Sequence, residues 1–247
     1  MRKLTTKTFK TAALLGALAM VSAAQAAGVP GQGTWETTLQ ARDIDKDGTT
    51  DAFYDTELNI TWLRAGSTGT MDWGTAKAWA ENGNFFGLSG WRLPTTHVTT
   101  PDGSCDYSYT GGTSCGYNPL SDKVNGSEMA HLFFQSLGNK SYVAPGTINY
   151  QPGYGLSNTG DFQNLQSKFY WSGTEFASES DYAWFFHTNV GLQSELAKHF
   201  SEYALAVRDG DVTAAVPEPQ SYALMLAGLG LMGFAARRRN SNSNKQQ

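Results

Sequence analysis

The amino-acid sequence predicts an α+β fold: two early helices, then antiparallel strands separated by turn-rich segments. Three observations support this prediction. Two segments repeat apolar residues at helical spacing, and several later runs are aromatic or β-branched. The chain also holds 27 glycines beside 7 tryptophans, 11 tyrosines and 13 phenylalanines. Glycine marks turns and large aromatic residues favour strands, so this composition fits short strands and long ordered loops better than a helical bundle.

Two strands, one helix and a further short strand are expected in the first part of the domain. The segments 34–39 and 60–63 are predicted strands, and an aspartate-rich turn lies between them. Apolar residues recur at helical spacing over 71–81, which predicts an amphipathic helix. The run 90–95 is predicted to be a short strand that ends at its proline, because proline has no backbone N–H to donate.

A second helix and three more strands are expected in the second part. Ser127 is placed to cap a helix that Gly138 ends. Three strands are predicted over 169–174, 182–188 and 203–208. Long loops rich in glycine, asparagine and tyrosine precede and follow the second helix. Loops of such length are uncommon as passive connections, so they are candidates for binding.

The N-terminal segment 1–26 has the features of a secretory signal peptide. Arg2 and three lysines form a basic start, and an apolar stretch follows from about 12 to 24. Ala24 and Ala26 flank Gln25 in the small-x-small pattern that precedes cleavage by signal peptidase. The apolar stretch is short and a cleavage site follows it, which argues against a permanent membrane helix. The sequence therefore predicts an exported protein.

The C-terminal segment combines a proline motif, an apolar run and a basic cluster. A linker over 212–220 contains Pro217, Glu218 and Pro219, and the two prolines keep this stretch extended. The segment 221–239 is predicted to form a transmembrane helix. Its apolar run is somewhat short for a hydrocarbon core of about 30 Å, and snorkelling arginines can bridge the difference. Those arginines are Arg237, Arg238 and Arg239, ahead of a polar tail over 240–247.

This C-terminal arrangement resembles the PEP-CTERM sorting signal of Gram-negative bacteria, in which an exosortase recognises Pro-Glu-Pro. The basic cluster favours the cytoplasmic side, so the domain would face the periplasm. The resemblance implies a protein that is first anchored in the inner membrane and then released to the cell surface or extracellular matrix. An ordinary soluble helix would show a polar face, and the apolar run shows none.

The body of the chain, 27–211, is predicted to be one domain of about 190 residues, long enough to build a core. A formal net charge of -4 and a pI near 5.5 argue against a nucleic-acid partner. Cys105 and Cys115 are the chain's two cysteines, and in an exported protein they predict one disulfide. Reactive or metal-binding thiols are the alternative, but the pair lacks C-x-x-C spacing.

An acidic segment ahead of the predicted strand at 60–63 has the spacing of a calcium loop. The candidate ligands are Asp43, Asp45, Asp47, Thr49 (through its backbone carbonyl) and Asp51. They fall at positions 1, 3, 5, 7 and 9 of an EF-hand-type loop, with Gly48 at the sharp turn of position 6. Tyr54 occupies position 12, where such loops carry a bidentate glutamate, so any calcium binding should be weak. A solvated turn of aspartates and glycine is the alternative.

Three motifs are spaced along the domain: WRLPT at 91–95, YWSGTE at 170–175 and AVRD at 206–209. Through them, the segment from about 43 to 211 resembles the DUF1566 family, also called the Lcl C-terminal domain. Gly173 departs from the family's usual second serine. The resemblance implies a C-type-lectin-like fold, related to that of sulfatase-modifying factors, and structural roles for the motif residues. These residues are Trp91, Arg92, Pro94, Trp171 and Arg208.

No catalytic residue is predicted. The sequence G-T-S-C-G at 112–116 matches a nucleophile-elbow pattern, but no strand leads into it. The four histidines are scattered, and His131 and His187 have no recognisable carboxylate partner in the sequence. An envelope enzyme acting on polysaccharide or sulfated substrates is the alternative function, and it would need acids or a metal gathered from distant parts of the chain.

The favoured function is a binding or adhesion module at the cell envelope or in the exopolysaccharide matrix, whose partner is polysaccharide or another surface component. Tyrosine is a rigid amphipathic side chain, and tyrosines beside glycine and asparagine are typical of binding loops. The candidate ligand-binding residues are Tyr107, Tyr109, Tyr117, Tyr150 and Tyr154. Alternatively, these rings pack the loops onto the domain.

Overall fold

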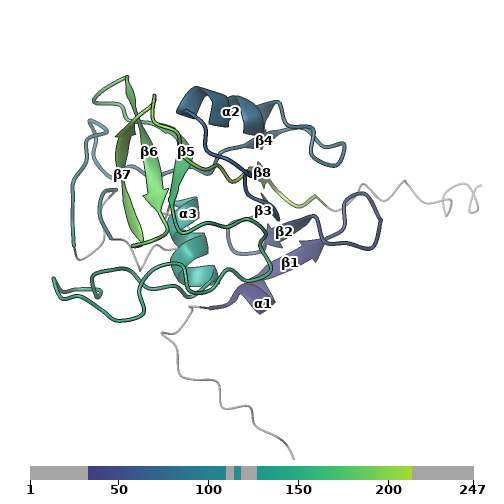
Figure 1. Ribbon diagram of the computed structural model, residues 1–247, viewed down its shortest axis with the longest axis horizontal. Coiled ribbons are helices and arrows are strands. Elements are labelled where there is room, and N and C mark those ends of the chain that lie inside the picture. Colours follow the sequence, from purple (N-terminus) through teal and green to yellow (C-terminus); the bar gives the residue numbers. More distant parts are fainter. Residues whose placement is uncertain (1–32, 110–113, 118–126, 213–247) are drawn as a thin grey trace, which may run out of the picture.

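The computed structural model describes residues 33–109, 114–117 and 127–212, and these form a mixed fold of short helices and two antiparallel sheets (Figure 1). Most of its regular structure is β, so the predicted combination of helices and antiparallel strands is confirmed. The predicted signal peptide, the Pro-Glu-Pro motif, the apolar segment and the polar tail lie outside the described residues. Within the described ranges, no helix has the length and apolar character needed to cross a membrane.

Two sheets make up the framework, and Figure 1 shows the smaller one at the left and the larger one at the right. The five-stranded sheet has the order β1 (Leu39–Arg42), β2 (Ala52–Asp55), β3 (Ile60–Leu63), β8 (Val207–Asp209) and β4 (Trp91–Arg92). The three-stranded sheet has the order β5 (Phe169–Glu175), β6 (Tyr182–His187) and β7 (Leu192–Ala197). Strand β8, from the end of the domain, therefore joins β3 and β4 from its beginning.

The helices are α1 (Trp35–Thr38), α2 (Trp73–Glu81) and α3 (Glu128–Ala130), which continues as a π-helix, η1 (His131–Ser136). The carboxylate of Asp72 caps α2 by accepting a 3.0 Å hydrogen bond from the Thr75 backbone N–H. Ser127 occupies the predicted cap position of α3, but its hydroxyl accepts a hydrogen bond from the His97 backbone N–H instead. Helix α2 and the helix at α3 and η1 correspond to the two predicted helices.

The central strands are buried on both faces: β3 is buried at every position, and β6 at its four central positions. Trp62 of β3 and Val207 of β8 belong to one apolar cluster with η1, while Leu63 and Ala206 belong to a second cluster with α2. Neighbouring residues on one strand thus enter opposite cores, as the two-residue period of a strand requires. Four tryptophans are among the largest fully buried side chains: Trp62, Trp91, Trp171 and Trp184.

Two predicted strands are placed differently in the structure. The segment 34–39 is not a strand along its length, because residues 35–38 form a helical turn whose last two residues donate hydrogen bonds to the Thr34 carbonyl. Pairing in β1 begins only at Leu39. The segment 203–208 becomes regular only at Val207, since Tyr203 makes a single bridge to Tyr170. Strand β7 was not predicted, because its alternation is weak and polar residues fill half of its positions.

Candidate functional site

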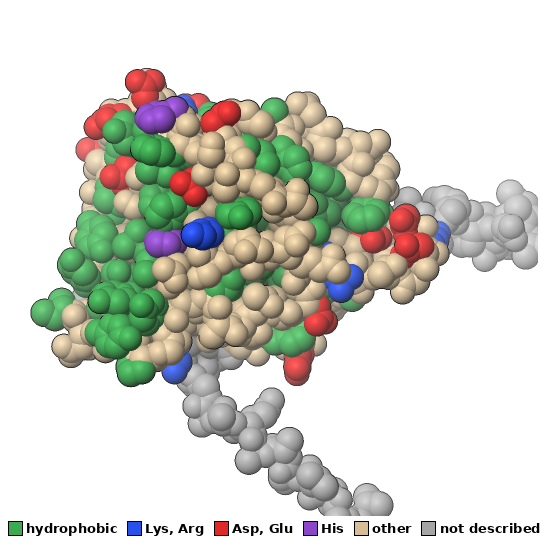
Figure 2. All heavy atoms as spheres, viewed as in Figure 1, with side chains coloured by type: hydrophobic (Ala, Val, Ile, Leu, Met, Phe, Trp, Pro, Cys, Tyr) green, Lys and Arg blue, Asp and Glu red, His purple; other side chains and the backbone are tan. Residues whose placement is uncertain are grey.

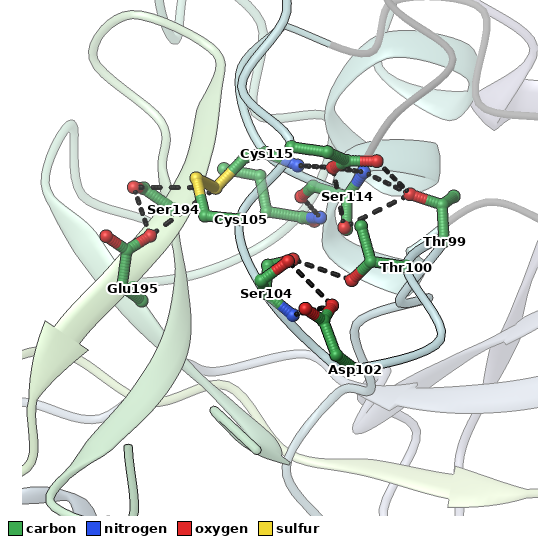
Figure 3. The surroundings of a disulfide bond; sticks show 11 residues. Thr99, Thr100, Asp102, Ser104, Cys105, Ser114, Cys115, Ser194 and Glu195 are labelled. Atoms are coloured by element: carbon green, nitrogen blue, oxygen red, sulfur yellow. Dashed lines mark hydrogen bonds between the residues drawn. A yellow bond between two sulfur atoms is a disulfide. The ribbon is translucent and has the colours of Figure 1, made fainter. Parts of the chain in front are cut away.

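Two irregular loops carry the predicted ligand-binding tyrosines, and the first is held together around the Cys105–Cys115 disulfide, which confirms the predicted pairing (Figure 3). Beside the disulfide, the Asp106 carboxylate accepts hydrogen bonds from the Ser114 hydroxyl at 2.8 Å and from the Thr99 hydroxyl at 2.6 Å. Partial burial opposes the charge of Asp106, but these hydrogen bonds outweigh it and lower the pKa of its carboxyl group. The described residues of this loop are therefore fixed by the disulfide and by hydrogen bonds to a charged carboxylate.

The second loop, between η1 and β5, is fixed by amide side chains. The side-chain oxygen of Asn139 accepts hydrogen bonds from the backbone N–H groups of Ser157 and Asn158, at 3.0 and 2.8 Å. The Asn139 amide also donates to the Asn158 carbonyl at 2.8 Å, and the Gln151 amide donates to the Ser141 carbonyl at 2.7 Å. These bonds supply the backbone partners that a helix or sheet would otherwise provide.

Both loops attach to the hairpin formed by β6 and β7. Gly116 and Gln193 exchange two backbone hydrogen bonds, of 2.7 and 2.9 Å, and the Tyr142 N–H donates to the Val190 carbonyl at 2.7 Å. Gly116 has φ +97°, and a Cβ there would collide with the backbone oxygen of Ser108. Only glycine satisfies this conformation and this close approach. The hairpin therefore brings two loops that are distant in sequence to one side of the domain.

The result is a tyrosine surface made of Tyr107, Tyr109, Tyr117, Tyr142, Tyr150 and Tyr154. In the first loop, adjoining ring centroids lie 5.1 and 6.2 Å apart. In the second loop, the three pairs lie 4.9 to 5.5 Å apart. The two groups adjoin, because both loops bond to the hairpin of β6 and β7, through Gly116 and Tyr142. Burial raises the pKa of Tyr117, and the nearby side chains of Tyr109 and Tyr142 add to this effect. Figure 2 shows apolar and aromatic side chains gathered at the lower left, over the long loops.

Most of these rings are open to solvent. Tyr150 is 57% exposed, Tyr109 48% and Tyr107 45%, whereas Tyr117 is buried beneath them. Burial raises the pKa of Tyr107, and the neighbouring hydroxyls of Tyr117 and Tyr109 add to this effect. The Tyr107 hydroxyl is therefore protonated at neutral pH and can donate a hydrogen bond. The structure brings all five predicted tyrosines together and adds Tyr142. Tyr142 was not predicted, although it lies in the same glycine-rich and asparagine-rich loop as Tyr150 and Tyr154.

The acidic segment forms the loop between β1 and β2. Carboxylate oxygens of Asp43, Asp45 and Asp51 lie within 4.8 Å of one another, with Asp51 buried and the other two exposed. Asp47 accepts hydrogen bonds from the Thr49 hydroxyl and backbone N–H, which lower the pKa of the Asp47 carboxyl group. Three predicted ligands thus converge, while Asp47 is engaged with Thr49. Figure 2 shows acidic side chains gathered at the right, over this loop.

Arg92 links the strands to the second helix. Its guanidinium forms two 2.8 Å hydrogen bonds with the Glu128 carboxylate and a 2.6 Å hydrogen bond with Asp209 of β8. Glu128 begins α3, so this one side chain joins β4, β8 and the helix. A bidentate arginine–carboxylate pair is strongly directional, and the geometry is that of a structural tie.

The other motif residues lie around the same strands. Trp91 is paired with Arg208 across β4 and β8. The Pro94 carbonyl accepts a 2.8 Å hydrogen bond from the Gly173 backbone N–H, which connects the two sheets. Trp171 is fully buried in the cluster that also contains Trp91. The three motifs, well separated in sequence, therefore meet where the two sheets join.

A histidine and two carboxylates meet inside the core, although the sequence showed no carboxylate partner for His131. His131 is 1% exposed, and its Nε2 lies 3.4 Å from Glu57 Oε2. Asp55 is fully buried and accepts hydrogen bonds from the backbone N–H groups of Glu57 and Leu58 and from Trp62 Nε1. Burial raises the pKa of Asp55, against the opposing effects of the Leu58 N–H and of His131. Sequence spacing could not reveal this cluster, because only the tertiary fold brings η1 to the turn after β2.

His187 is a partly buried residue at the end of β6. Burial lowers the pKa of His187 to about 4, and the charge of Lys168 contributes to this shift. Its ring centroid lies 4.0 Å from that of Phe169, in an edge contact across β5 and β6. His187 is therefore a neutral packing residue at physiological pH.

Comparison with known protein families matches residues 215–239 to the PEP-CTERM protein-sorting motif. No curated protein and no solved structure matches the chain. The chain therefore carries an exosortase sorting signal, which implies an exported protein that is processed by exosortase and bears a membrane-anchored sorting signal. The match confirms the predicted sorting segment, which lies outside the described residues.

Proposed function

We propose that this chain is a non-enzymatic binding module, sorted to the cell envelope or the extracellular matrix, whose tyrosine surface binds polysaccharide. The observation that carries the proposal is the convergence of six tyrosines from two loops on one largely exposed face. Before sorting, the domain would face the periplasm from an anchor in the inner membrane. After release, it would remain with the surface or the matrix.

The chemistry of tyrosine supports a polysaccharide ligand. A tyrosine ring offers a flat apolar face for the C–H groups of a sugar ring, while its hydroxyl can donate to and accept from sugar hydroxyls. Ordering a tyrosine fixes few rotatable bonds, so the entropic cost of binding is low. An array of such rings on rigid loops can contact several consecutive sugars. The tyrosine surface therefore suits a long, repetitive and mostly neutral ligand.

The alternative role, packing the loops onto the domain, fits the six rings less well. A ring whose role is only to pack a loop against the domain should be buried, as Tyr117 is. Tyr109 and Tyr150 instead keep about half of their surface in solvent, and Ile148 beside them in the second loop is 80% exposed. Asn139 and Asp106 already accept hydrogen bonds from the loop backbones. Exposed apolar surface of this kind is a typical mark of an interaction site.

We also propose that the domain is a DUF1566 relative with a C-type-lectin-like fold. The meeting of the WRLPT, YWSGTE and AVRD motifs at the junction of the two sheets supports this proposal. In such an arrangement, a small mixed core displays long ordered loops on one side. Loops of that kind are where ligand contacts concentrate when a rigid framework holds them.

The test is binding of the purified full chain to immobilised extracellular polysaccharide extracted from the same cells. One tyrosine is removed from each loop in the variant Tyr109→Ala with Tyr150→Ala. Each ring is expected to contribute about 0.5–1.5 kcal/mol, so the double variant should bind about fivefold to 150-fold more weakly. Phe200→Ala is the matched control, because Phe200 is also an aromatic residue and is 48% exposed, but lies outside the tyrosine surface.

The thermal melting temperature of each variant separates lost binding from lost folding, since exposed rings contribute little to stability. Equal binding by the wild-type chain and the double variant would contradict the role of the tyrosine surface. Release of new reducing ends from the polysaccharide would instead identify a glycoside hydrolase and contradict the non-enzymatic part of the proposal.

A further inference from the structure

A pocket of about 420 Å³ lies between the end of β3, helix α2 and the turn that follows α2. It shares no residue with the tyrosine surface, and in Figure 1 the two places lie on different sides of the domain: α2 at the top, the long loops at the lower left. Its volume falls within the roughly 300–1,000 Å³ that small-molecule sites occupy. We propose that this pocket binds a single neutral sugar ring, such as a chain end or side branch of a polysaccharide.

Aromatic residues form one wall of the pocket. Trp79 of α2 and Phe85 contact each other edge to face, with centroids 5.2 Å apart, and both line the pocket. Phe85 in turn contacts the buried Trp91 ring at 5.7 Å, which fixes its position. Phe86 is also a lining residue and is 42% exposed. The wall thus presents an apolar face that is supported from behind by the core.

Phe86 has a backbone conformation that its own residue type disfavours. Phe86 and Gly87 have φ +55° and +77°, and the Leu88 N–H donates to the Phe85 carbonyl at 3.0 Å, which closes a tight turn. Two consecutive positive φ values favour Asn-Gly at these positions, and a bulky residue in the first one is strained. Residues that break a local conformational rule cluster at functional sites. Phe86 therefore places a ring at the pocket mouth in spite of its backbone cost.

The facing wall is rigid and polar. Arg64 donates from Nη1 to the Thr50 carbonyl at 3.0 Å and from Nε to the Asp161 carbonyl at 3.1 Å, which ties two chain segments together. Behind it, the Gly66 N–H donates to the Gln163 carbonyl at 3.0 Å. This wall therefore keeps its shape without a ligand, as preformed sites do.

Residues with hydrogen-bonding side chains also line the pocket, beside the apolar wall. Thr50, Thr68 and Gln163 belong to this lining, and within the described part of the chain their side chains make no hydrogen bond. Asp51 and Arg64 both line the pocket and carry opposite charges, so the lining has no net charge that would select an ion. An apolar face opposite hydrogen-bonding groups with no net charge fits a neutral ring that has C–H groups on one side and hydroxyls at its edge.

The experiment titrates the full-length chain with the methyl glycosides of glucose, galactose and mannose, in a detergent that has no sugar headgroup. Tryptophan fluorescence is one readout, because Trp79 lines the pocket, and saturation-transfer NMR of the glycoside is a second. At least one glycoside should bind saturably in the millimolar range that its few atoms allow. Cyclohexanol has a ring of the same size with a single hydroxyl, and it should bind more weakly.

Two variants test the two walls. Phe86→Gly removes the ring while suiting the positive φ, and it should weaken glycoside binding about tenfold. Thr68→Val removes a hydroxyl at nearly constant volume and should also weaken binding. Tyr150→Ala belongs to the tyrosine surface and should leave glycoside binding unchanged. The proposed pocket and the proposed polysaccharide surface can therefore fail separately.

The folding of Phe86→Gly is checked by thermal melting, and its melting temperature should not fall, because glycine relieves the strain at this position. The proposal is overturned if none of the three glycosides binds saturably, if cyclohexanol binds as tightly as they do, or if Phe86→Gly retains wild-type affinity.

Discussion

Replacing Trp91 by alanine tests the arrangement of the core. The indole of Trp91 is 2% exposed, contacts the Phe85 ring edge to face at 5.7 Å and donates from Nε1 to the Leu88 carbonyl at 3.1 Å. Strand β4 contains only Trp91 and Arg92, so its attachment to β8 depends on few contacts. Removal of the indole should therefore leave a cavity beside the junction of the two sheets.

The expected cost follows from the buried area. A buried aromatic side chain removes about 150–250 Å² from water, which at about 25 cal/mol per Å² corresponds to about 4–6 kcal/mol as an upper value. Measured truncations of core tryptophan or phenylalanine cost about 3–5 kcal/mol. We expect Trp91→Ala to lower the free energy of unfolding by about 3–5 kcal/mol, a large part of the stability of an ordinary domain.

The assay is urea unfolding followed by far-ultraviolet circular dichroism, compared with Phe200→Ala as an exposed aromatic control. Phe200 is 48% exposed, so the control should change the free energy of unfolding by no more than about 0.5 kcal/mol. A loss below about 1 kcal/mol for Trp91→Ala would refute the assignment of Trp91 to the core.

Two further predictions concern carboxylates. Calorimetric titration of the protein with calcium should detect weak binding, with a dissociation constant on the order of 10⁻⁴–10⁻³ M, because Tyr54 replaces the closing glutamate. Asp45→Ala should abolish that heat, and its absence from the wild-type protein would contradict a calcium loop. The second prediction concerns Asp55, whose pKa is raised chiefly by burial, so that the native state holds this proton more tightly than the unfolded chain does. The free energy of unfolding should therefore fall as the pH rises from about 3.9, the ordinary pKa of aspartate, through the raised native pKa. Asp55→Asn should flatten this dependence in thermal melting above about pH 3.9, and an unchanged slope would show that Asp55 is not its source.

Helix α2 shows which elements local sequence can predict. The Asp72 cap, the spacing of Trp73, Ala76 and Ala80, and the end after Glu81 are all contained in consecutive residues. The disulfide is similar in kind, because a single pair of cysteines in an exported chain leaves one intramolecular partner for each. In both cases, the features that predict the structure lie within a short stretch of sequence or in the identity of the residues.

Strands β7 and β8 show where such reasoning fails. Strand β7 is a strand because β6 provides a partner for each of its six residues, although its own residues alternate weakly. Strand β8 is short because β3 and β4 offer partners only from Val207 to Asp209. Strand bounds are thus set by the neighbouring strand, and β-propensity is correspondingly dependent on context.

The sequence by itself determined the sorting signal, the disulfide and the α+β class, since each depends on residue identity or on a short period along the chain. Only the tertiary structure decided that two loops would join their tyrosines on one surface and that Glu57 would meet His131 inside the core. It also decided that the strained Phe86 would stand at the mouth of a pocket. The physical reason is that these groups are distant in sequence, and long-range strand pairing and core packing bring them together.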